Sequence, residues 1–352
     1  MDANLDRNVG RVLDGIDVAG VRDDTIVIYL HDNGADHDGF SAGLRGRKGT
    51  VFEGGVRSPF FVRWPNRFEP GTRRGVVGIH LDVVPTVLEA CGLEIPDAGL
   101  DGRSLFGSLG SESKQPVPES DRTVVIQAHR GDAPVRWSNV MVRSGDWKLV
   151  NASGFGRELD PGVTPPLDLE LFDLGSDPGE QVDLADRRPD VVTRLSDHYE
   201  AWFDDVSRGD SVAYLPPSIS LGATPEPVWL TRQDWRRTSR GGWGGRSSGA
   251  WWVEAVDVGP YRIRVRPLPD QPRPKAIRVE FDGRPLTRFP IESESGSMIS
   301  GPVEIPARRG RLCVIVEDEA GEYGAYQVEI RRERRSIPET PSPGIDRQPA
   351  GD

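Results

Sequence analysis

The sequence has few of the features that mark membrane, disulfide-rich or nucleic-acid-binding proteins. No run of about 18 apolar residues occurs, so no segment is predicted to span a membrane. Only two cysteines are present, Cys91 and Cys313, and they are predicted to be buried thiols, which leaves the redox compartment open. The net charge of -11 disfavours nonspecific nucleic-acid binding, because an acidic surface repels phosphate.

The composition predicts a globular chain of more than one domain. A length of 352 residues is long for one domain and indicates two or three. The mean hydropathy of -0.47 fits a polar surface around ordinary cores. The 41 glycines and 30 prolines favour turns and strands over a helical bundle.

The first third of the chain carries helix and strand patterns in the order expected for part of a doubly wound α/β sheet. Residues 1–26 predict an amphipathic helix, without the apolar core of a secretory signal peptide. Thr25–Leu30 predict a strand buried on both faces, and Phe60–Trp64 predict a second strand. Residues 80–92 predict a helix. We expect residues 1–120 to form part of an α/β domain.

The rest of the chain predicts two further folded regions. Residues 121–206 show short antiparallel strands closed by a helix, which indicates a small α+β subdomain. Residues 207–227 are rich in proline, serine and glycine and predict a linker. Regular alternation over residues 228–332 predicts a β-sandwich, and the proline-rich residues 333–352 predict a disordered tail.

Asp32 and Asn33 end the first predicted strand. Open α/β sheets bind their ligands at the carboxyl ends of strands, and these two side chains offer hard oxygen donors suited to Ca²⁺ or Mg²⁺. Calcium takes roughly six to eight oxygens, so two donors are too few for a complete site. Spacing alone favours the alternative, a polar turn at Asp32-Asn33-Gly34.

A basic, glycine-spaced segment follows. Lys48 stands with Arg45 and Arg47 among three glycines, and such a loop can bring backbone and point charges close to an anion. The spacing is not that of a Walker phosphate loop, and a solvated basic loop is the alternative.

Read together, these segments resemble the sulfatase family, of the arylsulfatase type within the alkaline-phosphatase-like superfamily. The resemblance rests on "TIVIYLHDNG", on "KGTVFEGGVRSP" and on "HLDVVPTVLEACGL", in this order, and extends through "WKLV" and "ELFDLGSDPGEQVDL" to about residue 206. The resemblance implies a partial alkaline-phosphatase-like sheet and hydrolysis of sulfate esters. It also implies that family members are often exported to the periplasm or exterior.

Carried over by motif, the resemblance implies roles for three residues. Asp32 and Asn33 would be ligands of an active-site calcium ion, and Lys48 would be a catalytic and substrate-binding residue that contacts the sulfate oxygens. Glu53 and Arg57 would hold the loop through an ion pair. The roles of the loop histidines stay open. They are His31 and His37, with His80 interpreted as a structural residue at a helix start.

The formylglycine nucleophile of sulfatases is made from a Cys or Ser in a C/S-x-P-x-R motif, and this sequence has no such motif. The family's first metal-binding acids would also precede residue 32. We therefore expect the C-terminal portion of a sulfatase, from a mis-started, split or decayed gene, with an incomplete calcium site and no activity alone. The alternatives are a phosphoester or phosphonate hydrolase of the same superfamily, or a non-catalytic remnant whose sandwich binds carbohydrate.

Tryptophans gather at the start of the predicted sandwich. Trp235, Trp243, Trp251 and Trp252 stand among glycines and arginines, a composition that can stack on sugar rings. Sulfated polysaccharide is therefore a possible partner of the sandwich. Core packing of the same tryptophans is an equally weighted alternative.

Overall fold

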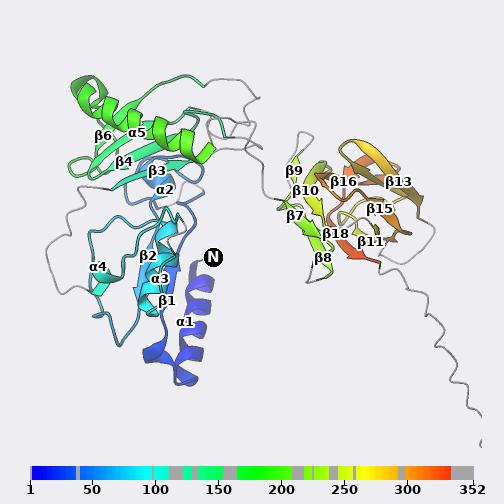
Figure 1. Cartoon of the computed structure of the whole chain (residues 1–352), viewed down its shortest axis with the longest axis horizontal. Helices are drawn as coiled ribbons and strands as arrows, with labels where there is room; N and C mark the ends of the chain where they lie inside the picture. The colour runs from blue at the N-terminus through cyan, green and yellow to red at the C-terminus, as the bar shows by residue number, and fades with distance from the viewer. Residues whose placement is uncertain are drawn as a thin grey trace, which may run out of the picture. The chain divides into compact units, whose positions relative to one another are not determined.

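The computed structural model describes residues 2–36, 40–96, 99–110, 122–128, 134–153, 165–207, 218–223, 226–237, 245–256, 259–291 and 298–333. His37, Trp243, most of the predicted linker and residues 334–352 of the predicted tail lie outside these ranges. The chain forms two compact units, Met1–Tyr214 and Leu215–Asp352 (Figure 1). The domain boundaries predicted within the first unit stay predictions.

The first unit begins with helix α1 (Asp2–Val18), which is shorter than the predicted helix over residues 1–26. Gly20 ends the helix in the left-handed conformation, with φ of 71°. The N–H of Gly20 donates to the Asp17 carbonyl at 3.1 Å, and the N–H of Val21 donates to the Ile16 carbonyl at 3.3 Å. These two bonds cap the last turn in a Schellman motif and turn the chain toward the first strand. The short helix η1 (Arg22–Asp24) completes that turn.

Strand β1 (Val27–Leu30) pairs with β2 (Phe60–Arg63) in an antiparallel two-stranded ribbon. The prediction that Thr25–Leu30 is buried on both faces is wrong, because β1 is half-buried and Leu30 is exposed. Within the described residues β2 is the one strand that pairs with β1, so no neighbouring strands cover the rest of it. The mixed α/β character predicted for the chain is present, with this ribbon in place of a wider sheet.

A four-stranded antiparallel sheet forms the second layer of the first unit. Its strands run in the order β3 (Thr123–Gln127), β4 (Val140–Ser144), β5 (Trp147–Asn151) and β6 (Glu170–Asp173). Helix α5 (Pro189–Ser207) covers one face, where Leu195 and Tyr199 pack on Val142 and Leu149 (Figure 1). The other face packs against Phe52, which belongs to the glycine-rich loop, residues 43–57. The sheet therefore fixes the loop that carries Lys48.

Short helices connect these layers. They are α2 (Glu53–Val56), η2 (His80–Asp82), α3 (Val83–Ala90), α4 (Phe106–Gly110) and η3 (Ala185–Arg187). The predicted helix over residues 80–92 is thus divided between η2 and α3. Cys91, predicted to be buried, is exposed because it follows the last turn of α3. No helix in the described ranges is long and apolar enough to cross a bilayer.

The second unit is built from two sheets on one core. The larger sheet contains β7 (Ile219–Leu221), β9 (Arg236–Arg237), β10 (Gly249–Ala255), β12 (Ala276–Phe281), β13 (Arg284–Pro290), β16 (Arg309–Asp318) and β17 (Gly321–Gly324). The smaller sheet contains β8 (Val228–Thr231), β11 (Gly259–Arg266), β14 (Met298–Ile299), β15 (Val303–Ile305) and β18 (Gln327–Arg332). Alternate residues of both sheets enter the common core, as the sequence alternation predicted.

The tryptophans at the start of this unit pack mostly inward. Trp251 is 0% exposed and Trp235 is 3% exposed, with ring centroids 5.6 Å apart, so the sugar-stacking interpretation is wrong for both. Trp252 is half-buried, with the Arg309 guanidinium 5.5 Å from its ring. The parity of β10 explains the difference, because Trp251 shares a face with Val253 whereas Trp252 lies on the other face.

Candidate functional site

The polar residues after β1 lie beside the glycine-rich loop. The N–H of Gly34 donates to the Gly55 carbonyl at 2.9 Å, and the N–H of Lys48 donates to the Ala35 carbonyl at 2.8 Å. A Cβ on Gly34 would lie 1.8 Å from the carbonyl oxygen of Gly54, so only glycine permits this approach. The backbone therefore holds the two predicted site segments side by side.

One large cavity of about 2420 Å³ has Asp32, Asn33 and Lys48 in its lining. Asp32 and Lys48 are exposed and Asn33 is half-buried, so these side chains are accessible to a ligand. The apolar side of α1 also lines the cavity through Leu5 and Val9. Its volume exceeds the roughly 300–1,000 Å³ typical of small-molecule pockets. The cavity is thus a broad opening with one polar region.

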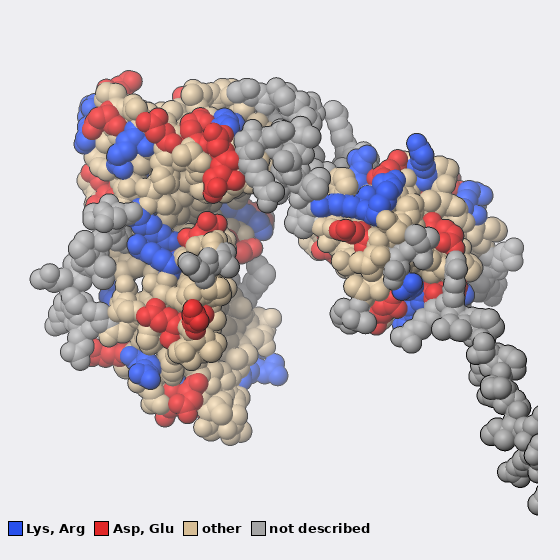
Figure 2. Space-filling model, in the orientation of Figure 1, with Lys and Arg blue, Asp and Glu red and all other residues tan. Residues whose placement is uncertain are grey.

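Further charged side chains line the same cavity and were not assigned to it from the sequence. They include Asp36, Arg47, Arg57, Arg73 and His80. Over the whole lining there are eight Lys or Arg side chains and five Asp or Glu side chains, an excess of cations that suits an anionic ligand. Figure 2 shows acidic and basic side chains interspersed over the face of each unit that it draws, so this excess is a local one.

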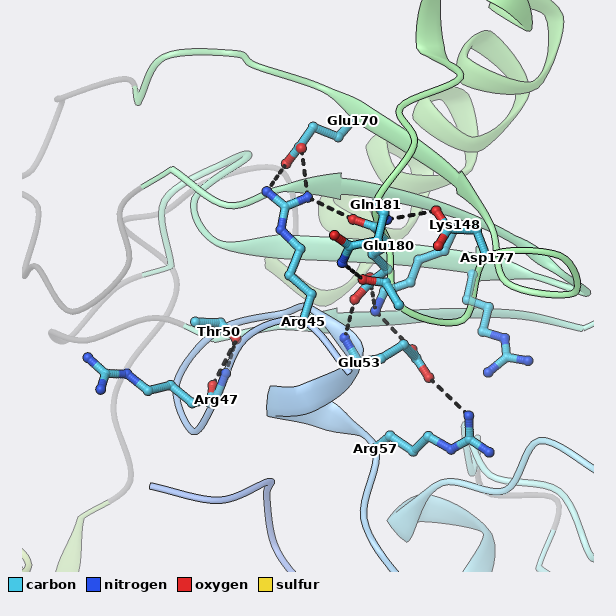
Figure 3. Close-up of polar contacts among 12 residues, drawn as sticks. Arg45, Arg47, Thr50, Glu53, Arg57, Lys148, Glu170, Asp177, Glu180 and Gln181 are labelled. Carbon is cyan, nitrogen blue, oxygen red and sulfur yellow. Dashed lines mark hydrogen bonds and ion pairs between the residues drawn. The ribbon is translucent and has the colours of Figure 1, made fainter. Parts of the chain in front are cut away.

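A buried ionic cluster anchors the loop to the four-stranded sheet (Figure 3). Lys148 Nζ on β5 lies 2.9 Å from Glu53 Oε1 and 2.8 Å from Glu180 Oε1. Glu180 Oε2 accepts a hydrogen bond from the Glu53 backbone N–H at 2.6 Å. All three side chains are almost inaccessible to water. We call Glu53, Lys148 and Glu180 the lysine cluster.

The lysine cluster contains two carboxylates for one ammonium group. Burial raises the pKa of Glu180 above its ordinary value, and Lys148 offsets only part of that effect. The expected ion pair between Arg57 and Glu53 is present at 3.9 Å, but Arg57 is largely exposed. Lys148 is therefore the main counter-charge of Glu53, a contact that the sequence reasoning missed.

Arg45 adds a second attachment between the loop and the sheet. Its guanidinium donates to Glu170 Oε1 at 2.9 Å and to the Glu180 carbonyl (Figure 3). The Arg45 Cζ also lies 3.9 Å from the Phe52 ring centroid. The loop is thus held by charge on one side and by aromatic packing on the other. Such support fixes the backbone from which Lys48 extends.

A separate buried ion pair fixes the segment that carries His80. Asp82 accepts hydrogen bonds at 2.7 Å from both terminal nitrogens of Arg122. It also accepts hydrogen bonds from the backbone N–H groups of Ile79 and Arg103. Burial alone would raise the pKa of Asp82, but the Arg122 hydrogen bonds and the two backbone donors lower it below its ordinary value. This carboxylate is therefore fully paired, unlike those of the lysine cluster.

Two histidines, His31 and His80, line the large cavity. His31 Nε2 lies 2.6 Å from the Tyr29 hydroxyl, and the His31 side chain is exposed. His80 is exposed at the start of η2 and lines the cavity. His37 lies outside the described residues.

The donors present do not make a complete calcium site. Asp32 and Asn33 offer hard oxygens on the cavity wall, whereas calcium takes roughly six to eight. Over the ranges that the structure describes, no group of three or more His, Cys, Asp or Glu side chains is placed to hold a metal.

Comparison with known proteins gives consistent matches. Residues 3–93 match the family model described as Sulfatase. Arylsulfatase A of Bos taurus is 33% identical over 206 residues, which cover 53% of this chain and 39% of that protein. Steryl-sulfatase of Mus musculus is 31% identical over 278 residues, which cover 70% of this chain and 41% of that protein.

Among solved structures, the PsFucS1 sulfatase from Pseudoalteromonas sp. is similar with a TM-score of 0.45 and 21% identity. That match covers 59% of this chain and 42% of the other chain. This chain therefore spans less than half the length of each of these three relatives.

Proposed function

We propose that this chain carries one side of the active site of a sulfuric ester hydrolase, because residues 3–93 match the family model described as Sulfatase. Lys48 binds the sulfate oxygens as a point charge, and Asp32 and Asn33 are two of the oxygen ligands of a divalent cation, with calcium expected. The observation that carries the proposal is the pairing of Gly34 with Gly55 and of Ala35 with Lys48, which brings both segments to one cavity.

The chemistry of this side is anion binding. Lys48 is aided by the other cations of the cavity wall, and charge-assisted hydrogen bonds to an oxyanion are about twice as strong as neutral ones. The nucleophile is not among the 352 residues, because no C/S-x-P-x-R motif is present. We infer that the chain alone binds a sulfate ester without hydrolysing it.

The test is calorimetric binding of 4-nitrophenyl sulfate by the full chain. We expect Lys48→Ala to weaken binding by at least about tenfold, because one hydrogen bond to a charged group contributes roughly 1.5–3 kcal/mol. Arg187→Ala is the matched control, because Arg187 is an exposed cation of the same unit that does not line the cavity; it should change the affinity less than about twofold. Equal losses in both variants would show that Lys48 has no special role.

The same preparation tests the remaining parts of the proposal. Terbium luminescence, with Tb³⁺ in place of Ca²⁺, should fall in Asp32→Asn and persist in Asp36→Asn, a control on the same loop. Release of 4-nitrophenol by the chain alone would overturn the inferred lack of turnover. Tighter binding of phenyl phosphate or phenylphosphonate than of the sulfate ester would favour the phosphoester or phosphonate alternative.

A further inference from the structure

The smaller sheet of the second unit turns an unusual set of side chains outward. On β11, Arg262, Arg264 and Arg266 alternate with core residues and are all exposed. Trp229 on β8 also points outward and is 42% exposed, whereas its neighbour Leu230 is buried. These positions share one face because side chains alternate along each strand.

The pairing register places these side chains in adjacent rows. Trp229 is opposite Glu329, which is opposite Arg264, so one row crosses strands β8, β18 and β11. The next row contains Arg266 opposite Gln327. Arg331 follows Glu329 on the same face of β18. We call Trp229, Arg262, Arg264, Arg266 and Arg331 the arginine face.

The arginine face keeps an excess of positive charge. Glu329 is shared by Arg264 at 3.5 Å and Arg331 at 3.7 Å, and Glu333 pairs with Arg262. Two carboxylates thus partner three of the four arginines, within a chain of net charge -11. A local cationic surface on an acidic protein attracts polyanions selectively, because the rest of the molecule repels them.

Arg266 and Trp229 form the centre of this surface. Within the described residues Arg266 has no carboxylate partner, and its Cζ lies 5.7 Å from the Trp229 ring centroid. A cation near an aromatic face is attracted by the ring electrons, which orients the guanidinium beside the ring. A second exposed aromatic residue, Tyr326, is 49% exposed. Its backbone lies beside that of Arg266, because the Tyr326 N–H donates to the Arg266 carbonyl at 3.0 Å.

We propose that the arginine face binds an anionic polysaccharide, with Trp229 stacking on a sugar ring and the arginines contacting its sulfate or carboxylate groups. Successive outward positions on a strand lie about 6.6 Å apart, so the three arginines of β11 form a row of roughly 13 Å. A sheet face with such a row suits an extended, repetitive chain of charges. This site lies outside the cavity of the first unit, and it does not rest on the function proposed there.

The test measures binding of dextran sulfate, unsulfated dextran and poly-L-glutamate to the full chain by biolayer interferometry. We expect binding of dextran sulfate that weakens with salt, weaker binding of poly-L-glutamate and none of dextran. Trp229→Ala should weaken dextran sulfate binding about three- to fivefold and Arg266→Ala about three- to tenfold, from the usual strengths of cation–aromatic contacts and charged hydrogen bonds. Trp229→Phe should retain most of the affinity.

Arg284→Ala is the matched control, because Arg284 is an exposed arginine on the other sheet. An equal loss of affinity in Arg284→Ala and Arg266→Ala would overturn the proposal, because binding would then depend on exposed arginines in general and not on the arginine face. Equal affinity for dextran sulfate and poly-L-glutamate, with Trp229→Ala unchanged, would also overturn it. So would a change of oligomeric state in Trp229→Ala, measured by light scattering, because the face would then join copies of the chain.

Discussion

Each unit contains a cluster of ion pairs, and the two clusters differ in their exposure to water. In the first unit, Lys148 Nζ lies within 2.9 Å of carboxylate oxygens of Glu53 and Glu180. All three side chains are buried. In the second unit, Arg278 donates two hydrogen bonds of 2.8 Å to Glu322, whose side chain is 52% exposed. The distances are similar, so the surroundings decide how much each contact matters.

The difference in burial determines how much each set of ion pairs contributes to stability. A buried charge that loses its partner stays desolvated, and removal of one partner costs about 3–5 kcal/mol. An exposed pair gains solvation when it is broken and contributes roughly 0–1 kcal/mol. We therefore expect the lysine cluster to control the loop that carries Lys48, and the Arg278 network to contribute little.

The largest effect is expected from Lys148→Met, which removes the ammonium group at similar side-chain volume. Two buried carboxylates would then lack a buried counter-charge, and we expect a loss of about 4 kcal/mol in the free energy of unfolding. Urea denaturation measures it. Hydrogen exchange should rise in peptides that cover residues 43–57 and strand β5, because the loop loses its anchor.

The same substitution at an exposed position provides the control. Lys48→Met should cost less than about 0.5 kcal/mol, since Lys48 is exposed and forms no buried ion pair with any described residue. Adding Glu180→Gln to Lys148→Met should restore part of the stability, because it removes one of the stranded charges. If the Lys148→Met and Lys48→Met variants were equally stable, the lysine cluster would have no structural importance.

The comparison sharpens within the first unit, where two buried carboxylates should respond to pH in opposite directions. Glu180 has a raised pKa, so its stabilising contribution is complete below its ordinary value of about 4.5 and is lost as the pH rises through the raised value. Asp82 has a lowered pKa, so its contribution is present above about 3.8 and is lost as the pH falls through the lowered value.

Unfolding measured across pH 3 to 8 tests these signs. Asp82→Asn should cost about 3 kcal/mol near neutral pH and progressively less in acid, because it leaves Arg122 without its carboxylate. Glu180→Gln should lower the free energy of unfolding most in acid and least near neutral pH, because the stabilising contribution of wild-type Glu180 is lost as the pH rises. Parallel pH profiles in the two variants would contradict the assigned pKa directions.

Much of this fold could be predicted from local pattern. The alternation in β11 gave both its core and its outward arginines, and the helical spacing before Trp202 indicated α5. The burial of Thr25–Leu30 could not be predicted, because an apolar run indicates a strand but does not determine which neighbours cover it. The orientation of Trp251 could have been read from its parity with Val253.

The site divides in the same way. The glycines around Lys48 predicted a backbone that comes close to an anion, and this stays a prediction. The close approach that the structure contains joins Gly34 to Gly54. The partner of Glu53 was missed because Lys148 lies 95 residues further along the chain. A lone lysine between Trp147 and Leu149 was the available signal, since a charge in an apolar strand needs a buried partner.

The smallest effect is expected from Glu322→Gln, which breaks the paired hydrogen bonds to Arg278 on the surface of the second unit. Arg278 keeps Glu280 and Glu317 as acceptors at 2.8 and 3.1 Å, so its charge is not stranded. We expect a loss of no more than about 0.5 kcal/mol at low salt, falling toward zero at about 1 M salt as screening increases. Urea denaturation at both salt concentrations measures it. A salt-independent loss of several kcal/mol would show that this exposed network is as important as the lysine cluster, and the contrast between the units would fail.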